Sequence, residues 1–469
     1  MEDKERVLVG KLNYREIDFD FILEDKILKL ITPEDKKIQV LDDMVLCARR
    51  YKVDGLTDAT AMEESYLSGT CIETGQAIIF LTEKGSQISF ENTTLFISLR
   101  GYILFDGDTA CSIDGMSFNG PEIDCIYSTQ KGYECNFDEE DFYQNGIFSF
   151  QTKPYSISDS KKHSFTTDGK NVEFSFNISR KISYQVLKPP VEIHSSLRFH
   201  FKETQDYTFL IRLWYVAKAF LSYLCYRKSI TFDSVQLYTI VKEGKRRRIA
   251  TLHMVEDDTL VDTEPLKKRK FIKHEWIEGF ESEIFSKISN QSLYLNHLPK
   301  TYLSGKTKDE ASFIMITSAF EWEFRQTYPD GLPKKDSTIA VEDEVRSAIQ
   351  ALIDKTSGPV KKKYKFLLKL ITASSLKEEL IKVCNDFEDI AGDFARYLYR
   401  LNGKVLNYTE MGERLASQRN NFAHGNLDKE FDVDSLLDLS FLEYLVYAMQ
   451  LKRIGISKEN IHHALDALF

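Results

Sequence analysis

Apolar and polar residues alternate with a period of two along much of residues 1–205, as half-buried antiparallel strands require. The alternation is regular over residues 172–176 and 197–201. Shorter apolar runs, separated by Gly, Asn and Asp turns, occur at residues 7–9, 19–23, 77–81, 95–99, 102–105 and 147–150. Many short strands of this kind predict an antiparallel sandwich or one curved sheet.

After residue 205 the period of the apolar positions becomes helical. Residues 206–227 carry one apolar stripe, residues 230–254 return to strand character, and helical spacing resumes at about residue 274. The helices expected after that point cover residues 310–327, 341–354, 377–402, 409–425, 435–453 and 460–469. We therefore predict an α+β protein with a β-rich region of residues 1–205, a mixed connecting region of residues 206–305 and an all-α bundle of residues 306–469.

Composition narrows the class of protein. Hydrophobic residues make up 42% of the chain and aromatic residues 12%, which is enough for packed cores and argues against disorder. The formal net charge of −10 excludes a general polyanion binder, so any contact with RNA needs a local basic patch. Seven cysteines occur without a C-x-x-C pair, as is typical of reduced thiols in a cytosol. The sequence has no metal-ligand pattern and no cofactor motif, so we expect neither group.

Two further features favour a cytoplasmic protein that does not cross a membrane. The chain starts Met-Glu-Asp-Lys-Glu, which does not resemble a signal peptide. The longest apolar stretch, residues 209–225, contains Arg212 and Lys218. Charges at these positions argue against a membrane span.

Residues 419–425 read Arg-Asn-Asn-Phe-Ala-His-Gly and form the one motif with a clear chemical meaning. The helix that contains them is expected to begin near Thr409, which is a candidate N-cap, and to end at Gly425. His424 then lies in the last turn, where unpaired carbonyls favour the imidazolium form. Asn420 is four residues earlier and shares its helix face, while Arg419 can reach the same volume with its long side chain.

A guanidinium, an amide and an imidazole in one volume predict cleavage of RNA without a metal. Arg419 binds the phosphate and its transition-state charge, His424 transfers protons, and Asn420 positions these groups. One histidine supplies an acid or a base, so a two-fold dimer is needed to bring both. The alternative is that His424 is only a partner of the helix dipole.

Residues 309–469 resemble a HEPN domain, a helical bundle in which a late helix carries Arg, a polar residue and then His, as at Arg419, Asn420 and His424. An early helix with an acidic residue is also similar, at Glu321. We expect Glu321 either to support Arg419 or to be an ordinary surface residue. The whole chain is similar to the ApeA group of single-protein anti-phage systems.

The resemblance implies a metal-independent endoribonuclease that acts across a homodimer or a higher oligomer. It also implies a toxic enzyme that stays inactive until a phage-derived trigger appears, with RNA, tRNA among the candidates, as the substrate. Residues 1–205 would serve in sensing or substrate selection. The alternative within the same family is a non-catalytic protein that binds a nucleotide or a partner.

Two groups of basic residues are candidate contacts to RNA phosphates. A solvated surface explains the first group equally well and the second group somewhat better, because basic runs are common on surfaces. On the helix of the second group, Phe366 and Leu370 are predicted to mark the core side. The candidates are Arg246, Arg247 and Arg248 in the first group, and Lys361, Lys365 and Lys369, spaced four residues apart, in the second.

Overall fold

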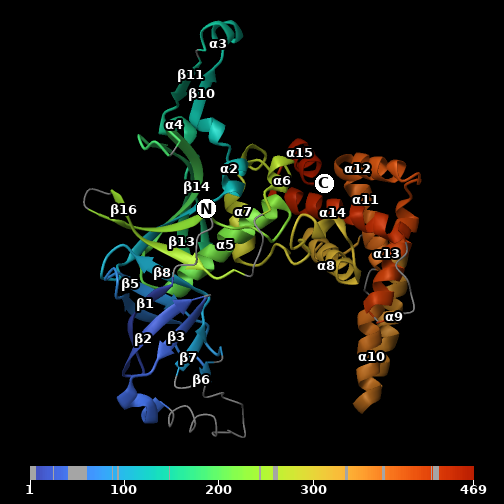
Figure 1. Cartoon of the computed structure of the whole chain (residues 1–469). Helices are drawn as coiled ribbons and strands as arrows, with labels where there is room; N and C mark the ends of the chain where they lie inside the picture. The colour runs from blue at the N-terminus through green and yellow to red at the C-terminus, as the bar shows by residue number, and fades with distance from the viewer. Residues whose placement is uncertain are drawn as a thin grey trace. The chain divides into compact units, whose positions relative to one another are not determined.

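The computed structural model describes the chain in two compact units (Figure 1). It describes all residues except 1–6, 25, 41–60, 87, 92–93, 147, 188, 242–244, 257–261, 333–335, 372–374, 424 and 426–432. For residues 90, 141, 336, 338 and 369–371 it describes the backbone but not the side chain. Unit 1 contains Met1–Leu224, Ser229–Lys268 and Glu281–Asn290, and unit 2 contains Cys225–Lys228, Arg269–Phe280 and Gln291–Phe469. Residues 206–305, expected as a separate connecting region, are thus divided between the two units.

Unit 1 is built on an antiparallel sheet, as the alternating pattern predicts. In its described part, 14 strands form one sheet in the order β12-β13-β14-β9-β15-β16-β8-β5-β4-β1-β2-β3-β7-β6. A short additional pair, β10 (Tyr133–Asn136) and β11 (Ser149–Thr152), stands apart from it. The strands of the sheet are β1 (Leu8–Tyr14), β2 (Ile17–Glu24), β3 (Ile27–Ile31), β4 (Tyr66–Cys71), β5 (Ala77–Leu81), β6 (Ser89–Glu91), β7 (Thr94–Ser98), β8 (Gly101–Phe105), β9 (Ile113–Asn119), β12 (His163–Thr167), β13 (Lys170–Ile182), β14 (Val191–Thr204), β15 (Ser234–Ile240) and β16 (Arg246–Met254).

The sheet forks between β15 and β16. Their ladder ends at Val235 and Leu252, whereas β15 continues beside β9 to Ser234 and β16 continues beside β8 to Met254. Strands β1 to β8 enclose one apolar core. The other half of the sheet is covered by α5 (Tyr207–Cys225) and α7 (Glu281–Ser289).

Helix α5 is the core helix of unit 1. The five apolar residues that define its predicted stripe are all buried: Phe209, Leu213, Val216, Phe220 and Leu224. Among the described residues, α5 is also the one helix whose length and apolar composition would suffice to cross a membrane. Because 72% of that apolar window is buried inside the protein, its composition is explained by core packing.

The helices of unit 2 confirm the all-α prediction for the C-terminal part. The apolar stripe predicted for the first of them, from Phe313 to Phe324, is buried. The segment 377–402, expected as one helix, is two helices separated at Phe387, whose ring is buried beneath Lys452. The helices are α8 (Glu310–Thr327), α9 (Asp336–Lys355), α10 (Gly358–Ile371), α11 (Leu376–Asp386), α12 (Glu388–Leu401), α13 (Tyr408–Ala423), α14 (Val433–Ile454) and α15 (Lys458–Leu468).

Helices α9 and α10 pack mainly against each other and project from the rest of unit 2 (Figure 1). Ile353 of α9 is buried, but Phe366 of α10 is 56% exposed, and the side chain of Leu370 lies outside the described part of the chain. The prediction that Phe366 marks a core side is therefore wrong. A pair of helices encloses too little volume to bury the apolar residues of both.

Candidate functional site

The candidate site lies at the C-terminal end of α13. The expected end of this helix is confirmed, because α13 ends at Ala423 and Gly425 has a φ of 68°. The backbone N–H of Gly425 donates to the carbonyl of Phe422 over 3.1 Å. His424 itself lies outside the described residues.

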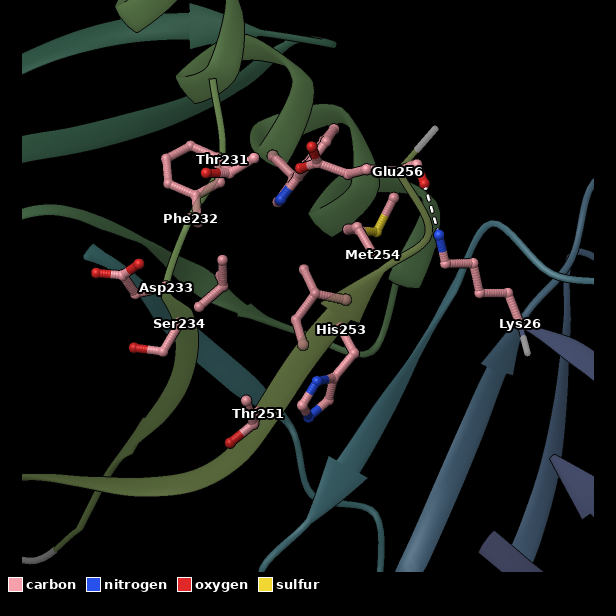
Figure 2. Close-up of a pocket in the computed structure, with 12 residues that line it drawn as sticks. Lys26, Thr231, Phe232, Asp233, Ser234, Thr251, His253, Met254 and Glu256 are labelled. Atoms are coloured by element: carbon pink, nitrogen blue, oxygen red, sulfur yellow. Dashed lines mark hydrogen bonds between the residues drawn. The ribbon is translucent and has the colours of Figure 1, made fainter. Parts of the chain in front are cut away.

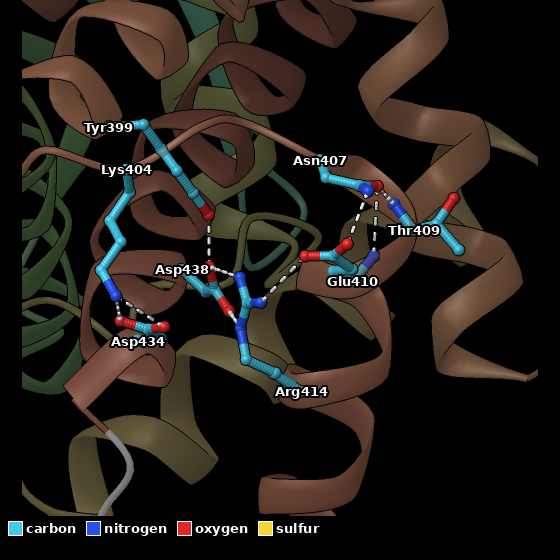
Figure 3. Close-up of polar contacts among 8 residues, drawn as sticks. All are labelled: Tyr399, Lys404, Asn407, Thr409, Glu410, Arg414, Asp434 and Asp438. Atoms are coloured by element: carbon cyan, nitrogen blue, oxygen red, sulfur yellow. Dashed lines mark hydrogen bonds and ion pairs between the residues drawn. The ribbon is translucent and has the colours of Figure 1, made fainter.

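The beginning of α13 differs from the prediction by two residues. Asn407 caps the helix, because its Oδ1 accepts hydrogen bonds from the backbone N–H of Thr409 at 3.0 Å and of Glu410 at 3.4 Å (Figure 3). Thr409, predicted as the cap, lies in the first turn. Since Asn and Thr are both capping residues, sequence type alone does not distinguish them.

A buried ion pair fixes α13 against α14. Arg414 donates from Nε to Oδ2 of Asp438 over 2.7 Å and from Nη2 to Oδ1 over 2.9 Å (Figure 3). Tyr399 of α12 donates its hydroxyl to the same Oδ1. Asp438 is fully buried; burial raises the pKa of its carboxyl, and the bonds from Arg414 and Tyr399 oppose that rise. A bidentate pair of this kind restricts the rotation of α13 about its axis.

Arg419 lies one turn beyond Leu415, a fully buried residue, and its side chain reaches α8. Its Nη2 lies 3.1 Å from Oε1 of Glu321. The Arg419 side chain is 37% exposed and that of Glu321 is 24% exposed, so both groups remain open to solvent on one side. Of the two expectations for Glu321, the geometry fits contact with Arg419.

The last turn of α13 is also held to α8 by aromatic packing. The rings of Phe422 and Phe313 meet edge to face, with centroids 5.4 Å apart. Asn420 is exposed beside this contact. The described part of the motif therefore presents a guanidinium and an amide to solvent from an anchored helix end.

Chemically, this arrangement can bind an anion. A guanidinium has five N–H donors, and one ion pair with a carboxylate leaves donors for phosphate oxygens. The carboxylate of Glu321 limits the positions that the guanidinium can take.

The arginines of the first basic group belong to β16 in unit 1, and two of them are already paired. Arg246 lies 3.4 Å from Asp114, and Arg248 makes a bidentate pair with Asp106 at 3.1 and 3.2 Å. Arg247 is exposed.

The lysines of the second basic group lie on α10 in unit 2. Lys361 is half-buried and Lys365 is exposed, whereas the side chain of Lys369 lies outside the described part of the chain.

Arg414, Tyr399 and Asp438 belong to no recognisable motif, and their contact was not predicted from the sequence. A signal for one of them exists, because Asp438 interrupts a strongly apolar helix between Leu437 and Leu439. An acid in such a run is expected to have a buried partner. Which arginine supplies that partner depends on how the helices pack.

Unit 1 has a cavity of 420 Å³ at the fork of the sheet (Figure 2). Residues 231–235 line one side of it and residues 251–254 line the other. Among the described residues, the one lysine of the lining, Lys26, donates a hydrogen bond to the carbonyl of Glu256 over 2.8 Å. Lys218, which lies nearby, pairs with the Glu256 carboxylate at 2.8 Å. The fork cavity therefore has no surplus positive charge.

The chain was also compared with known proteins. No protein-family model, no curated protein and no solved structure matches it.

Proposed function

We propose that the chain is a metal-independent endoribonuclease of the HEPN type that acts in anti-phage defence by abortive infection. The observation that carries the proposal is the ion pair of Arg419 with Glu321 at a solvent-open helix end. It joins the arginine of the late-helix motif to the acidic residue of an early helix.

The proposed reaction is an internal transesterification. A base removes the proton of a ribose 2′-OH, and the 2′-oxygen attacks the adjacent phosphorus. The bond from phosphorus to the 5′-oxygen breaks, and an acid protonates that oxygen. The products are a 2′,3′-cyclic phosphate and a 5′-OH.

Each motif residue has one role in this reaction. Arg419 stabilises the charge on the phosphoryl oxygens, Asn420 positions the reacting groups, and His424 transfers a proton. Because acid and base are both required, we propose a homodimer or a higher homo-oligomer in which His424 of the partner subunit supplies the second group. Glu321 holds the guanidinium in place.

We also propose where the enzyme acts and what controls it. The protein acts in the cytoplasm on cellular RNA, with tRNA as one candidate, and is held inactive until a phage-derived trigger appears. Residues 1–205 take part in recognising the trigger or the RNA.

The test is incubation of the purified protein with total RNA in excess EDTA, followed by end mapping. In its active state wild type should cut and leave 2′,3′-cyclic phosphates, while Arg419→Ala and His424→Ala should each lose at least about 100-fold in rate. Arg346→Ala, which removes an exposed arginine from α9 in the same unit, is the matched control and should cut normally. Loss of cutting in EDTA would refute the metal-independent mechanism.

A non-catalytic binding protein is the alternative, and one observation favours it. A cavity of 480 Å³ in unit 2 is lined by residues of α8, α14 and the α11–α12 junction, Tyr328 and Lys452 among them, and none of them belongs to the motif. Expression separates the two functions. An enzyme is toxic when it is active and harmless as Arg419→Ala, whereas a binding protein is harmless in both forms.

A further inference from the structure

A second cavity of unit 1, of 570 Å³, has a different charge from the cavity at the fork. Its lining includes three cationic side chains, Lys170, Lys202 and Arg246, and one carboxylate, Glu173. Glu173 is paired with Lys162 at 2.8 Å, and the hydrogen bond from Lys162 lowers the pKa of Glu173. The cavity thus has a surplus of positive charge although the whole chain is acidic.

The three cations are unequally compensated. Lys170 pairs with Asp206 at 2.7 Å, and Arg246 makes a longer contact of 3.4 Å with Asp114 through Nε. Lys202 is exposed, and no ion pair joins it to another residue in the described part of the chain. Lys202 and the remaining donors of Arg246 are therefore available to an anion.

His200 holds the guanidinium of Arg246 toward the cavity. Its Nε2 lies 3.2 Å from Nη1 of Arg246. Burial, and then the charge of Arg246, lowers the pKa of His200 to about 4, so the ring is neutral at pH 7 and Nε2 accepts a hydrogen bond from the guanidinium.

The backbone brings these side chains together by two local features. The register of β14 against β9 shifts between His200 and Thr204, so three consecutive residues, His200 to Lys202, all line the cavity. Below the imidazole lies Gly115, where an added Cβ would lie 3.2 Å from Nδ1 of His200. The absence of a side chain there lets the ring lie close to the sheet.

One wall of the cavity is aromatic. The rings of Phe201 and Phe209 meet edge to face at 5.4 Å, and the ammonium of Lys170 lies 4.3 Å from the centre of the Phe209 ring. Phe201 is partly exposed. A planar ring bound beside the cations would therefore contact carbon on one side.

We propose that this cavity binds a mononucleotide, with its phosphomonoester on Arg246, Lys202 and Lys170 and its base against Phe201. The volume lies within the usual range for small-molecule sites, about 300–1,000 Å³. A bound phosphate would also neutralise the charge of Arg246 next to His200. This site is independent of the cleavage chemistry proposed for unit 2.

The test is calorimetric titration of the full chain with adenosine 5′-monophosphate, with adenosine and inorganic phosphate as component probes. Arg246→Ala and Lys202→Ala should each weaken binding of the monophosphate about 10- to 100-fold, because each removes a charged hydrogen bond. Arg246→Lys, which keeps the charge, should lose less. Lys181→Ala, which removes an exposed lysine of β13 that is not part of the lining, is the matched control and should bind as wild type does.

A second readout follows the imidazole directly. The NMR titration of His200 should move to higher pH with the monophosphate bound, and Lys181→Ala should retain that change. Equal binding of adenosine, no loss of binding in Arg246→Ala, or tighter binding of a 5′-phosphorylated RNA through the same residues would each overturn the mononucleotide assignment. His424→Ala should retain binding, which separates this result from failure of the nuclease proposal.

Discussion

Among single residues, Asp438 is the strongest determinant of how α13 is positioned. Its carboxylate is fully buried and its two oxygens are bound by Arg414 and Tyr399. Asp438→Asn would remove the nearest counter-charge of the Arg414 guanidinium, whose other carboxylate contact, with Glu410, is 3.8 Å long. Because Arg414 is 28% exposed, we expect a cost of about 1.5–3 kcal/mol, which is typical for hydrogen bonds to a charged group. Urea unfolding followed by circular dichroism measures this loss.

Asp434, which lies one turn before Asp438 on α14, provides the control for that prediction. Lys404 pairs with Asp434 at 3.0 Å, but both side chains are substantially exposed (Figure 3). Asp434→Asn should therefore cost less than about 1 kcal/mol. Equal losses from Asp434→Asn and Asp438→Asn would contradict the importance of burial.

For single residues, the sequence indicated the side chains of the candidate site but not the ion pair that holds α13 in place. The types and spacing of Arg419 and Asn420 led to the motif, and the acid at Glu321 proved to be its neighbour. The partnership of Arg414 with Asp438 was not predictable, because 24 residues separate them and several other arginines could have occupied the same position.

Among the elements, α13 shows that tertiary packing decides which of two possible capping residues begins a helix. The ring of Tyr408 lies parallel to that of Phe441, with centroids 6.3 Å apart, and its hydroxyl bonds to Glu388. These contacts put Tyr408 at the first helical position, so the cap moves to Asn407. The break at Phe387 has the same kind of cause, since a buried ring outweighs the continuous helical pattern around it.

The cap gives a prediction for this element. Asn407→Ala should destabilise the protein by about 1 kcal/mol, because two backbone N–H groups lose their acceptor. Asn407→Asp should retain most of the stability, and Thr409→Ala should change it little. Urea midpoints of the three variants test the assignment, and a larger effect at Thr409 would return the cap to that residue.

At the scale of the whole molecule, pH dependence should come in part from His297 of unit 2. This residue is buried between Tyr226 and Tyr294, and burial lowers its pKa to about 3. The unfolded chain binds a proton here below about pH 6.5, whereas the folded chain does not. The contribution of the neutral His297 to the unfolding free energy is therefore complete above about pH 6.5, and it is lost as the pH falls toward about 3.

The expected size follows from proton linkage. When the pH falls from about 7 to 5, this one group should lower the unfolding free energy by about 2 kcal/mol. His297→Gln should remove that part of the dependence of the unfolding free energy on pH. Urea unfolding at several pH values measures it. The exposed His463→Gln is the control, and identical slopes for wild type and His297→Gln would refute the prediction.

The α+β class and most strands and helices were predictable from periodicity, but the organisation into units was not. Strands β15 and β16 follow α5 in the chain, yet they enter the sheet between β9 and β8. Such pairing joins residues more than a hundred positions apart, such as Ser234 and Asn119. Local patterns carry no information about that choice.

Gly115 has a consequence for how the anion cavity could be inactivated. Its missing side chain leaves the space above the sheet in which the imidazole of His200 rests. One extra methyl group at this point would press on the ring and disturb its contact with the arginine it orients. A change as small as glycine to alanine, at a residue that would never touch a ligand, could thus disable recognition while every charged group of the cavity remained in the chain.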